Sequence, residues 1–322
     1  MSFQISHMWI ILGTTLLLTI LLMPYVIRYF RNKQLGQMTR EEGPKWHEAK
    51  SGTPTMGGVV FLLTASFSAL LFGSLYGLLS VPLLLTVFII LLYGSLGFVD
   101  DYIKLIMKRN LGLTSKQKFL GQVAGAILFF VVYKWTGLST ALPVPFLGEV
   151  HSDLLFGVFL VFWLVGFSNA VNLTDGLDGL VAGTGSIAYA AYAYIAYTQK
   201  QWDLFILAVA VIGGLIGFFL FNKKPAKIFM GDVGSLALGG GLAALSILLK
   251  REWSLLLIGI IFVIETASVI LQVASFKTTG KRIFKMSPIH HHFEMDGWSE
   301  WKVVLVFWSI GLLGSLSALW LM

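Results

Sequence analysis

The chain has 322 residues, of which 57% are hydrophobic and only 12% are charged. This charged share is about half that of a soluble globular protein, so a soluble fold is excluded because too few charged side chains are present to cover a surface in water. The net charge of +7 indicates membrane orientation rather than nucleic-acid binding, and the absence of cysteine excludes disulfides, thiolate metal sites and a cysteine nucleophile.

Long apolar segments follow one another along the whole chain. A helix needs about 20 mainly apolar residues to cross a bilayer, and the sequence predicts ten such helices, at residues 8–30, 55–78, 81–99, 119–137, 154–171, 179–198, 203–221, 233–249, 254–276 and 302–321. We expect the first to be retained rather than cleaved as a signal peptide, because no basic residue precedes it and its apolar run is long. The prediction is an all-α integral membrane protein with one polytopic domain, residues 1–322.

Basic residues predict the orientation of these helices. Ten spans place both termini on one side and the loops at 31–54, 100–118, 172–178, 222–232 and 277–301 on the other. Together with Arg28, these loops hold 18 of the 23 basic residues. Because Lys and Arg concentrate in cytoplasmic loops, the loops are predicted to face the cytoplasm, and both termini the extracytoplasmic side.

Five aspartates lie at helix ends on the predicted cytoplasmic side: Asp100, Asp101, Asp175, Asp178 and Asp232. Each alone has a simpler interpretation as a loop acid or, for Asp232, as a helix N-cap. Asp100 and Asp101 are adjacent, however, and neighbouring like charges repel unless a cation offsets them. Mg²⁺ takes one or two carboxylates and completes its shell with water and phosphate oxygens, so the pair suggests a magnesium-diphosphate site.

The segment NLTDGLDGL, residues 172–180, places Asn172, Asp175 and Asp178 three residues apart. On a helix they would share one broad face; alternatively, the glycines would open a turn and let a ligand approach the backbone. The segment contains no Lys or Arg. A metal, a distant basic residue or a ligand must therefore balance its acids.

The segment FMGDVGSL, residues 229–236, enters the eighth predicted span. A helix N-terminus favours anions, so Asp232 fits either an N-cap or a metal ligand beside a phosphate. Lys223, Lys224 and Lys227 lie just before it. They could attract a polyanionic substrate, or they could reflect membrane orientation alone.

Three consecutive histidines, His290, His291 and His292, occur in MSPIHHHFE. Neighbouring side chains diverge, so they cannot all face one metal, but histidines in a solvated loop can bind phosphate oxygens or shuttle protons. Glu265 lies inside the span 254–276, where an unpaired carboxylate is costly. We interpret Glu265 as a structural hydrogen-bonding group between helices rather than a catalytic one.

The motifs FVDDYIK, NLTDGLDGL, FMGDVGSLALGG and PIHHHFE, in this order and at these predicted membrane positions, resemble the phospho-N-acetylmuramoyl-pentapeptide transferase family of the bacterial plasma membrane. Residues 40–58 and 108–118 also resemble the cytoplasmic loops of that family. The wider superfamily of polyprenyl-phosphate N-acetylhexosamine-1-phosphate transferases shares the aspartates. The histidine triplet and the GTPTMGG loop favour the muramoyl branch.

The resemblance implies the substrates UDP-N-acetylmuramoyl-pentapeptide and undecaprenyl phosphate, the products lipid I and UMP, a requirement for Mg²⁺, and a ten-helix bundle that forms a homodimer. It also implies roles for particular residues. Asp232 would bind Mg²⁺, and Asp100 and Asp101 would hold or deprotonate the lipid phosphate, with Asp100 as the base. Asn172, Asp175 and Asp178 would line the nucleotide-sugar side, Phe229 would stack on uracil, and Lys116, His290, His291 and His292 would contact phosphates.

Other functions remain open from the sequence. A sister enzyme would transfer N-acetylglucosamine-1-phosphate to the same lipid. A transporter would place charges near the membrane midplane, whereas here only Glu265 is well inside a span. An inactive scaffold would leave the five aspartates unexplained. Direct attack by the lipid phosphate and a two-step route through an aspartyl-phosphate both fit the same residues.

Overall fold

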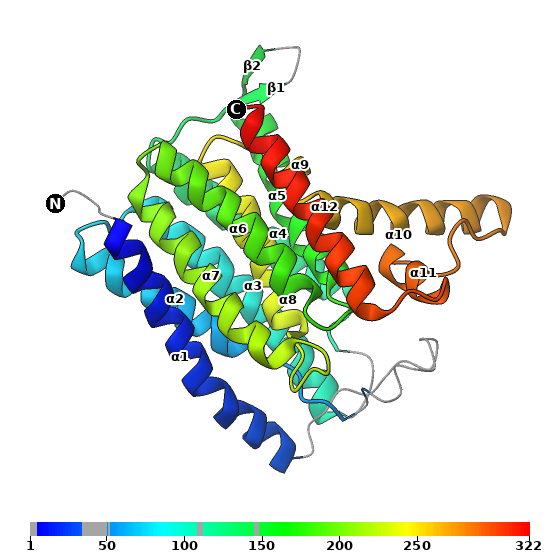
Figure 1. Ribbon diagram of the computed structural model, residues 1–322. Helices are drawn as coiled ribbons and strands as arrows, with labels where there is room; N and C mark the ends of the chain where they lie inside the picture. The colour runs from blue at the N-terminus through cyan, green and yellow to red at the C-terminus, as the bar shows by residue number, and fades with distance from the viewer. Residues whose placement is uncertain (1–4, 34–49, 51, 108–111, 145–147) are drawn as a thin grey trace.

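The computed structural model describes residues 5–33, 50, 52–107, 112–144 and 148–322, so parts of the motifs at 40–58 and 108–118 lie outside the described residues. The described chain is almost wholly helical (Figure 1). Its helices are α1 (Ile5–Asn32), α2 (Gly58–Leu75), α3 (Val81–Ile106), α4 (Ser115–Trp135), α5 (Asp153–Thr174), α6 (Leu180–Thr198), α7 (Trp202–Asn222), α8 (Gly231–Leu248), α9 (Ser254–Ile258), α10 (Ile260–Thr279), α11 (Ile289–Met295) and α12 (Glu300–Trp320).

The predicted all-α multi-pass architecture is confirmed. Among the described residues, nine helices are long and apolar enough to cross a membrane, and each corresponds to a predicted span. The remaining prediction, 179–198, coincides with α6. This helix has 19 residues, carries four tyrosines and is therefore less apolar, yet most of its residues are buried. It packs against α7 and α12, so protein rather than lipid covers most of its surface.

The prediction of one continuous helix over 254–276 is wrong. The chain forms the short helix α9, breaks at Gly259, and continues as α10 from Ile260. Glycine lowers helix stability by about 1 kcal/mol relative to alanine, and a Cβ atom at Gly259 would lie only 2.8 Å from the carbonyl oxygen of Leu255. After the break, α10 leaves the bundle and runs out sideways (Figure 1).

The central helix is α8, in which every residue from 233 to 248 is buried. Glycines allow its neighbours to approach its backbone closely. A Cβ atom at Gly97 of α3 would lie 2.2 Å from the carbonyl oxygen of Asp232, and one at Gly58 of α2 would lie 2.4 Å from the amide nitrogen of Gly234. Small residues permit such backbone contacts between membrane helices. The first turn of α8 is therefore surrounded by α2 and α3 at backbone distance.

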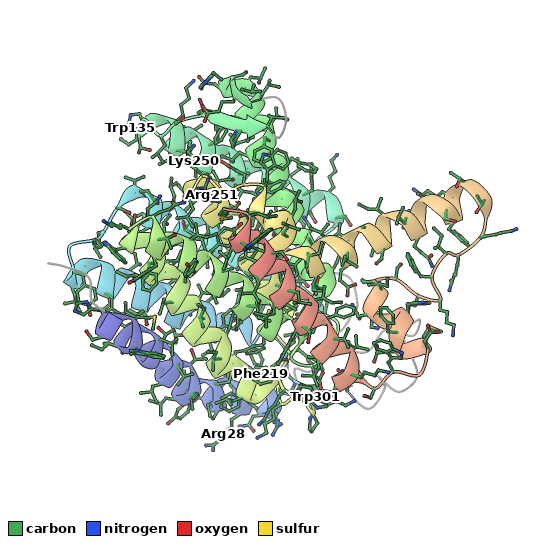
Figure 2. The ribbon with its side chains drawn as sticks, turned by 45° about the horizontal axis from the view of Figure 1, so that its top comes forward. Arg28, Trp135, Phe219, Lys250, Arg251 and Trp301 are labelled. Atoms are coloured by element: carbon green, nitrogen blue, oxygen red, sulfur yellow. The ribbon has the colours of Figure 1, made fainter. Side chains whose placement is uncertain are left out.

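The two ends of the bundle differ. Figure 2 shows Arg28, Phe219 and Trp301 at one end and Trp135, Lys250 and Arg251 at the other. An antiparallel hairpin of β1 (Ala141–Val144) and β2 (Gly148–His151) extends beyond the second end, close to the C-terminus (Figure 1). The hairpin lies in the predicted loop between the fourth and fifth spans. Phe219 lies near the end of α7 and Trp301 at the start of α12, so the turn from α7 into α8, which carries the FMGD motif, lies at the first end.

Candidate active site

Three of the predicted aspartates meet at the first end of the bundle. Asp100 and Asp101 lie near the end of α3, and Asp232 lies in the first turn of α8. Each offers one carboxylate oxygen, and the three oxygens lie within 4.8 Å of one another. Asp100 is fully buried and Asp101 is 5% exposed, whereas Asp232 is partly open to solvent. Residues 132 positions apart therefore form one acidic cluster.

Two lysines bind this cluster. The Lys104 Nζ atom lies 2.5 Å from Asp100 Oδ2 and 3.0 Å from Asp232 Oδ2. The Lys118 Nζ atom lies 3.0 Å from Asp100 Oδ2 and 2.6 Å from Asp232 Oδ2. Both ammonium groups thus bridge α3 and α8. They offset much of the repulsion that the three carboxylates would otherwise exert on one another.

Hydrogen bonds fix the orientation of each carboxylate. The Leu113 amide donates to Asp100 Oδ1 at 2.7 Å, and the Val233 amide donates to Asp101 Oδ2 at 3.3 Å. The Asn172 side-chain amide donates to Asp232 Oδ1 at 2.9 Å. The interpretation of Asp232 as an N-cap is wrong: the helix begins one residue earlier, and the Asp232 carboxylate points into the cluster instead.

The segment 172–180 forms a turn rather than one helical face. Helix α5 ends at Thr174, so Asn172 faces the aspartate cluster from the helix while Asp178 is directed elsewhere. Asp175 caps the C-terminus of α5. Removal from solvent, followed by the negative charges of Asp232 and Asp178, raises the pKa of the half-buried Asp175 carboxyl to about 7. This group therefore titrates near neutral pH.

Asp178 is balanced by a distant basic residue, Lys50. The Lys50 Nζ atom lies 2.8 Å from Asp178 Oδ1 and 2.5 Å from Glu300 Oε1. Burial opposes its charge, but the carboxylates of Glu300 and Asp178 raise the pKa of Lys50. Glu300 also accepts from the Asp178 amide at 2.8 Å and pairs with Lys224 at 3.0 Å. This network ties three loops to the start of α12.

Phe229 lies in the segment that leads into α8 and is partly exposed. Its backbone pairs with the loop before α2: the Phe229 amide donates to Pro54, and the Gly57 amide donates to Phe229, at 2.8 and 2.9 Å. The Gly58 amide donates to Met230 at 2.9 Å. The loop at 52–58 and the segment at 229–230 therefore form one short backbone ladder.

The histidine triplet lies on the short helix α11, not in a solvated loop. His290 is 1% exposed, and its Nδ1 atom lies 3.0 Å from Oε1 of the buried Glu265 on α10. The predicted hydrogen bond of Glu265 between helices is thus confirmed. His291 pairs with Glu294 at 2.9 Å, and His292 accepts from the Lys285 amide at 3.2 Å. The three rings have three different partners.

Comparison with known proteins decides the family. The profile described as "Glycosyl transferase family 4" matches residues 82–250, and the one described as "Phospho-N-acetylmuramoyl-pentapeptide-transferase signature 1" matches residues 50–62. The chain is 59% identical to the phospho-N-acetylmuramoyl-pentapeptide-transferase of Enterococcus faecalis over 95% of both chains. It is 62% identical to that of Lactiplantibacillus plantarum over 91% of this chain and 92% of the relative. The chain belongs to the phospho-N-acetylmuramoyl-pentapeptide-transferase family. It is therefore a transferase.

Four residues of this family member were not singled out by sequence reasoning: Lys50, Lys104, Lys118 and Glu300. Lys104 follows Asp100 by four residues on α3, a spacing that places both on one helix face and could have identified it. Nothing local marks Lys118. The predicted phosphate ligand, Lys116, is exposed in the first turn of α4, while Lys118 is the residue that turns onto the aspartates.

The aspartate cluster has the donor set of a metal-ion site. Its donors are hard carboxylate oxygens from two helices, gathered within 4.8 Å, and Mg²⁺ prefers such oxygens. The partly exposed Asp232 gives the cluster contact with solvent. Asp100, Asp101 and Asp232 are the residues that would hold the ion.

Proposed function

We propose that this chain transfers phospho-N-acetylmuramoyl-pentapeptide from UDP-N-acetylmuramoyl-pentapeptide to undecaprenyl phosphate, giving lipid I and UMP. The observation that carries the proposal is the cluster of Asp100, Asp101 and Asp232 with Lys104 and Lys118, in a chain whose relatives, over more than nine-tenths of its length, are transferases of this name.

The proposed reaction forms a bond between an oxygen of the lipid phosphate and the sugar-linked phosphorus. It breaks the bond from that phosphorus to UMP. Phosphoryl transfer depends mainly on positioning and on neutralising charge. Lys104 and Lys118 supply two positive charges at the junction of α3 and α8. We assign nucleotide-sugar contacts to Asn172, Asp175, Asp178 and Phe229, as the resemblance implies, and phosphate contacts to Lys116 and the three histidines.

Asp100 is our choice for the group that takes a proton from the lipid phosphate. Its carboxylate is held by two lysines and by the Leu113 amide. A phosphate monoester monoanion loses its remaining proton near pH 6, so the base needs no unusual basicity. Direct attack by the lipid phosphate and a route through an aspartyl-phosphate would both use this cluster.

We further propose Mg²⁺ as the cofactor, with Asp232 as its main ligand and Asp100 and Asp101 beside it. When bound, the ion would offset the charge of the diphosphate. We also propose that this end of the bundle faces the cytoplasm, because the loops that emerge there hold most of the basic residues, and that the chain acts as a homodimer in the bacterial plasma membrane, as the family resemblance implies.

UMP release by the detergent-purified chain tests the proposal. We expect release that requires UDP-N-acetylmuramoyl-pentapeptide, undecaprenyl phosphate and Mg²⁺, and that is lost in Asp232→Asn and Asp100→Asn. Release with UDP-N-acetylglucosamine instead would move the chain to the sister activity. If neither nucleotide sugar led to UMP release, the enzyme assignment would be overturned in favour of a transporter or scaffold.

A further inference from the structure

Glu265 and His290 form a buried pair between α10 and α11. Glu265 is 0% exposed and His290 is 1% exposed, and their Oε1 and Nδ1 atoms are 3.0 Å apart. A carboxylate deep in an apolar span is stable only when paired or neutral. The Ser268 hydroxyl donates to the backbone carbonyl of Glu265, not to its side chain. His290 is therefore the partner that the Glu265 carboxylate has among the described residues.

The other ring nitrogen of His290 faces the turn that follows α5. A Cβ atom at Gly176 would lie only 2.2 Å from His290 Nε2, so the ring is packed against the bare backbone of this glycine. Among the described residues, Nε2 is buried and has no hydrogen-bond partner. Gly176 is flanked by Asp175 and lies two residues before Asp178, both predicted to line the nucleotide-sugar side.

A carboxylate that accepts from Nδ1–H fixes both the tautomer and the rotation of an imidazole ring, and it leaves Nε2 for a second partner. The nearest other ring is that of His291, with centroids 4.1 Å apart, but His291 is itself paired with Glu294. Glu265 is thus the group that sets the orientation of His290. A buried polar atom without a partner, such as Nε2, calls for an explanation.

We infer that Glu265 is a positioning residue: it holds His290 so that Nε2 faces and supports the turn around Gly176, which carries Asp175 and Asp178, the proposed nucleotide-sugar contacts. This inference rests on the proposed function and extends it to a residue inside the membrane span. Glu265 does not touch the substrate. It acts through His290, by keeping one ring nitrogen occupied and the other directed at the site.

A double-mutant cycle separates positioning from general support of the fold. We expect Glu265→Ala to lower kcat for UMP release by about 10–100-fold, the range found when a group that orients a metal-binding histidine is removed. In the His290→Ala background, the same change should have no further effect, because residues that act through one another are non-additive. Glu265→Gln, whose amide oxygen can still accept from Nδ1–H, should retain more activity than Glu265→Ala.

Glu252→Ala is the matched control. Glu252 is a buried glutamate at the opposite end of the bundle, and neither of its carboxylate oxygens has a hydrogen-bond partner among the described residues. We expect Glu252→Ala to leave kcat unchanged. Nitrogen-15 chemical shifts of His290 provide a readout independent of turnover: Glu265→Ala should shift the ring from the Nδ1–H tautomer toward a mixture.

The possible outcomes distinguish a failure of the proposed function from a failure of the positioning role of Glu265. No UMP release by the unmodified chain would overturn the proposed function. Release by the unmodified chain, with Glu265→Ala equally active, would overturn the positioning role alone. An equal additional loss from Glu265→Ala in the His290→Ala background would also overturn it, since Glu265 would then support the fold independently of the histidine. An unchanged tautomer in folded Glu265→Ala would have the same meaning.

Discussion

Lys118 is expected to stabilise the aspartate cluster, because its ammonium group offsets negative charge that a bound metal ion would also offset. Its ammonium group lies 3.0 Å from Asp100 and 2.6 Å from Asp232, and its side chain is 20% exposed. Removing one partner of a fully buried ion pair costs about 3–5 kcal/mol. Because Lys118 is partly exposed and Lys104 still bridges the same carboxylates, we expect Lys118→Ala to lower the free energy of unfolding by about 1–3 kcal/mol.

Mg²⁺ should offset this loss. In Lys118→Ala, the cluster regains a cation between Asp100 and Asp232 when the ion binds, and binding to the folded state alone stabilises it by about 2.7 kcal/mol at 100 times the dissociation constant. The assay is thermal unfolding in detergent, with Mg²⁺ titrated from an EDTA-treated sample. Lys116→Ala is the matched control, since Lys116 lies two residues away, on the exposed surface of α4.

We expect Lys118→Ala to be clearly less stable than Lys116→Ala in EDTA, and to gain more stability from Mg²⁺ than the unmodified chain gains. Equal stability of the two variants in EDTA would refute the claim that Lys118 neutralises the cluster. A Mg²⁺ response no larger than that of the unmodified chain would refute the claim that the ion and the ammonium group serve the same carboxylates.

Three further predictions concern the surroundings of the cluster. Gly97→Ala should cost about 1–3 kcal/mol of stability by overpacking, because its Cβ atom would lie 2.2 Å from the Asp232 carbonyl oxygen. Gly13→Ala is the control and should cost little, because no atom lies within 4 Å of a Cβ at Gly13. Equal unfolding temperatures of the two variants would contradict the close contact between α3 and α8. The pKa of Asp175 in the folded chain is raised to about 7, whereas the same carboxyl in the unfolded chain ionises near pH 4, so the folded state loses stability as pH rises from about 4 to 7. The unfolding temperature of Asp175→Asn should therefore rise relative to that of the unmodified chain between pH 5 and pH 8. A constant difference would argue against the raised pKa. Glu300→Gln should lower the free energy of unfolding by about 1.5–3 kcal/mol, which is the contribution of a hydrogen bond to a charged group. Thermal unfolding measures this loss, and an unchanged transition would show that the Lys50 network contributes nothing to stability.

The helices were predictable because their signal is local. A run of about 20 apolar residues identifies a span without reference to the rest of the chain. Nine of the ten predicted segments correspond to one helix each, and the segment 254–276 is divided between α9 and α10. The break at Gly259 was not predicted, because apolar composition continues through it. The small hairpin at 141–151 was missed for the opposite reason: its strands have only four residues each, and they depend on pairing with each other.

The site was predictable where its residue types are unusual for a membrane protein. The adjacent Asp100 and Asp101 were conspicuous at a helix end, and so was Asp232. The partners of these acids were not predictable, since an ion pair such as Lys118 with Asp232 joins residues 114 positions apart and depends on the packing of α3, α4 and α8. Likewise, the burial of His290 follows from its contact with Glu265, which no local pattern in MSPIHHHFE encodes.

The backbone ladder between residues 54–58 and 229–230 links the opening of two segments that are far apart in the sequence. Its bonds are formed by main-chain groups, so side-chain substitutions at Phe229 leave the ladder intact, whereas replacing an amide by an ester would remove one bond directly. The amide hydrogens of Gly57, Gly58 and Phe229 should therefore exchange with deuterium at a common rate, as a single opening unit. Any motion that displaces the loop before α2 must displace the entrance to α8 with it.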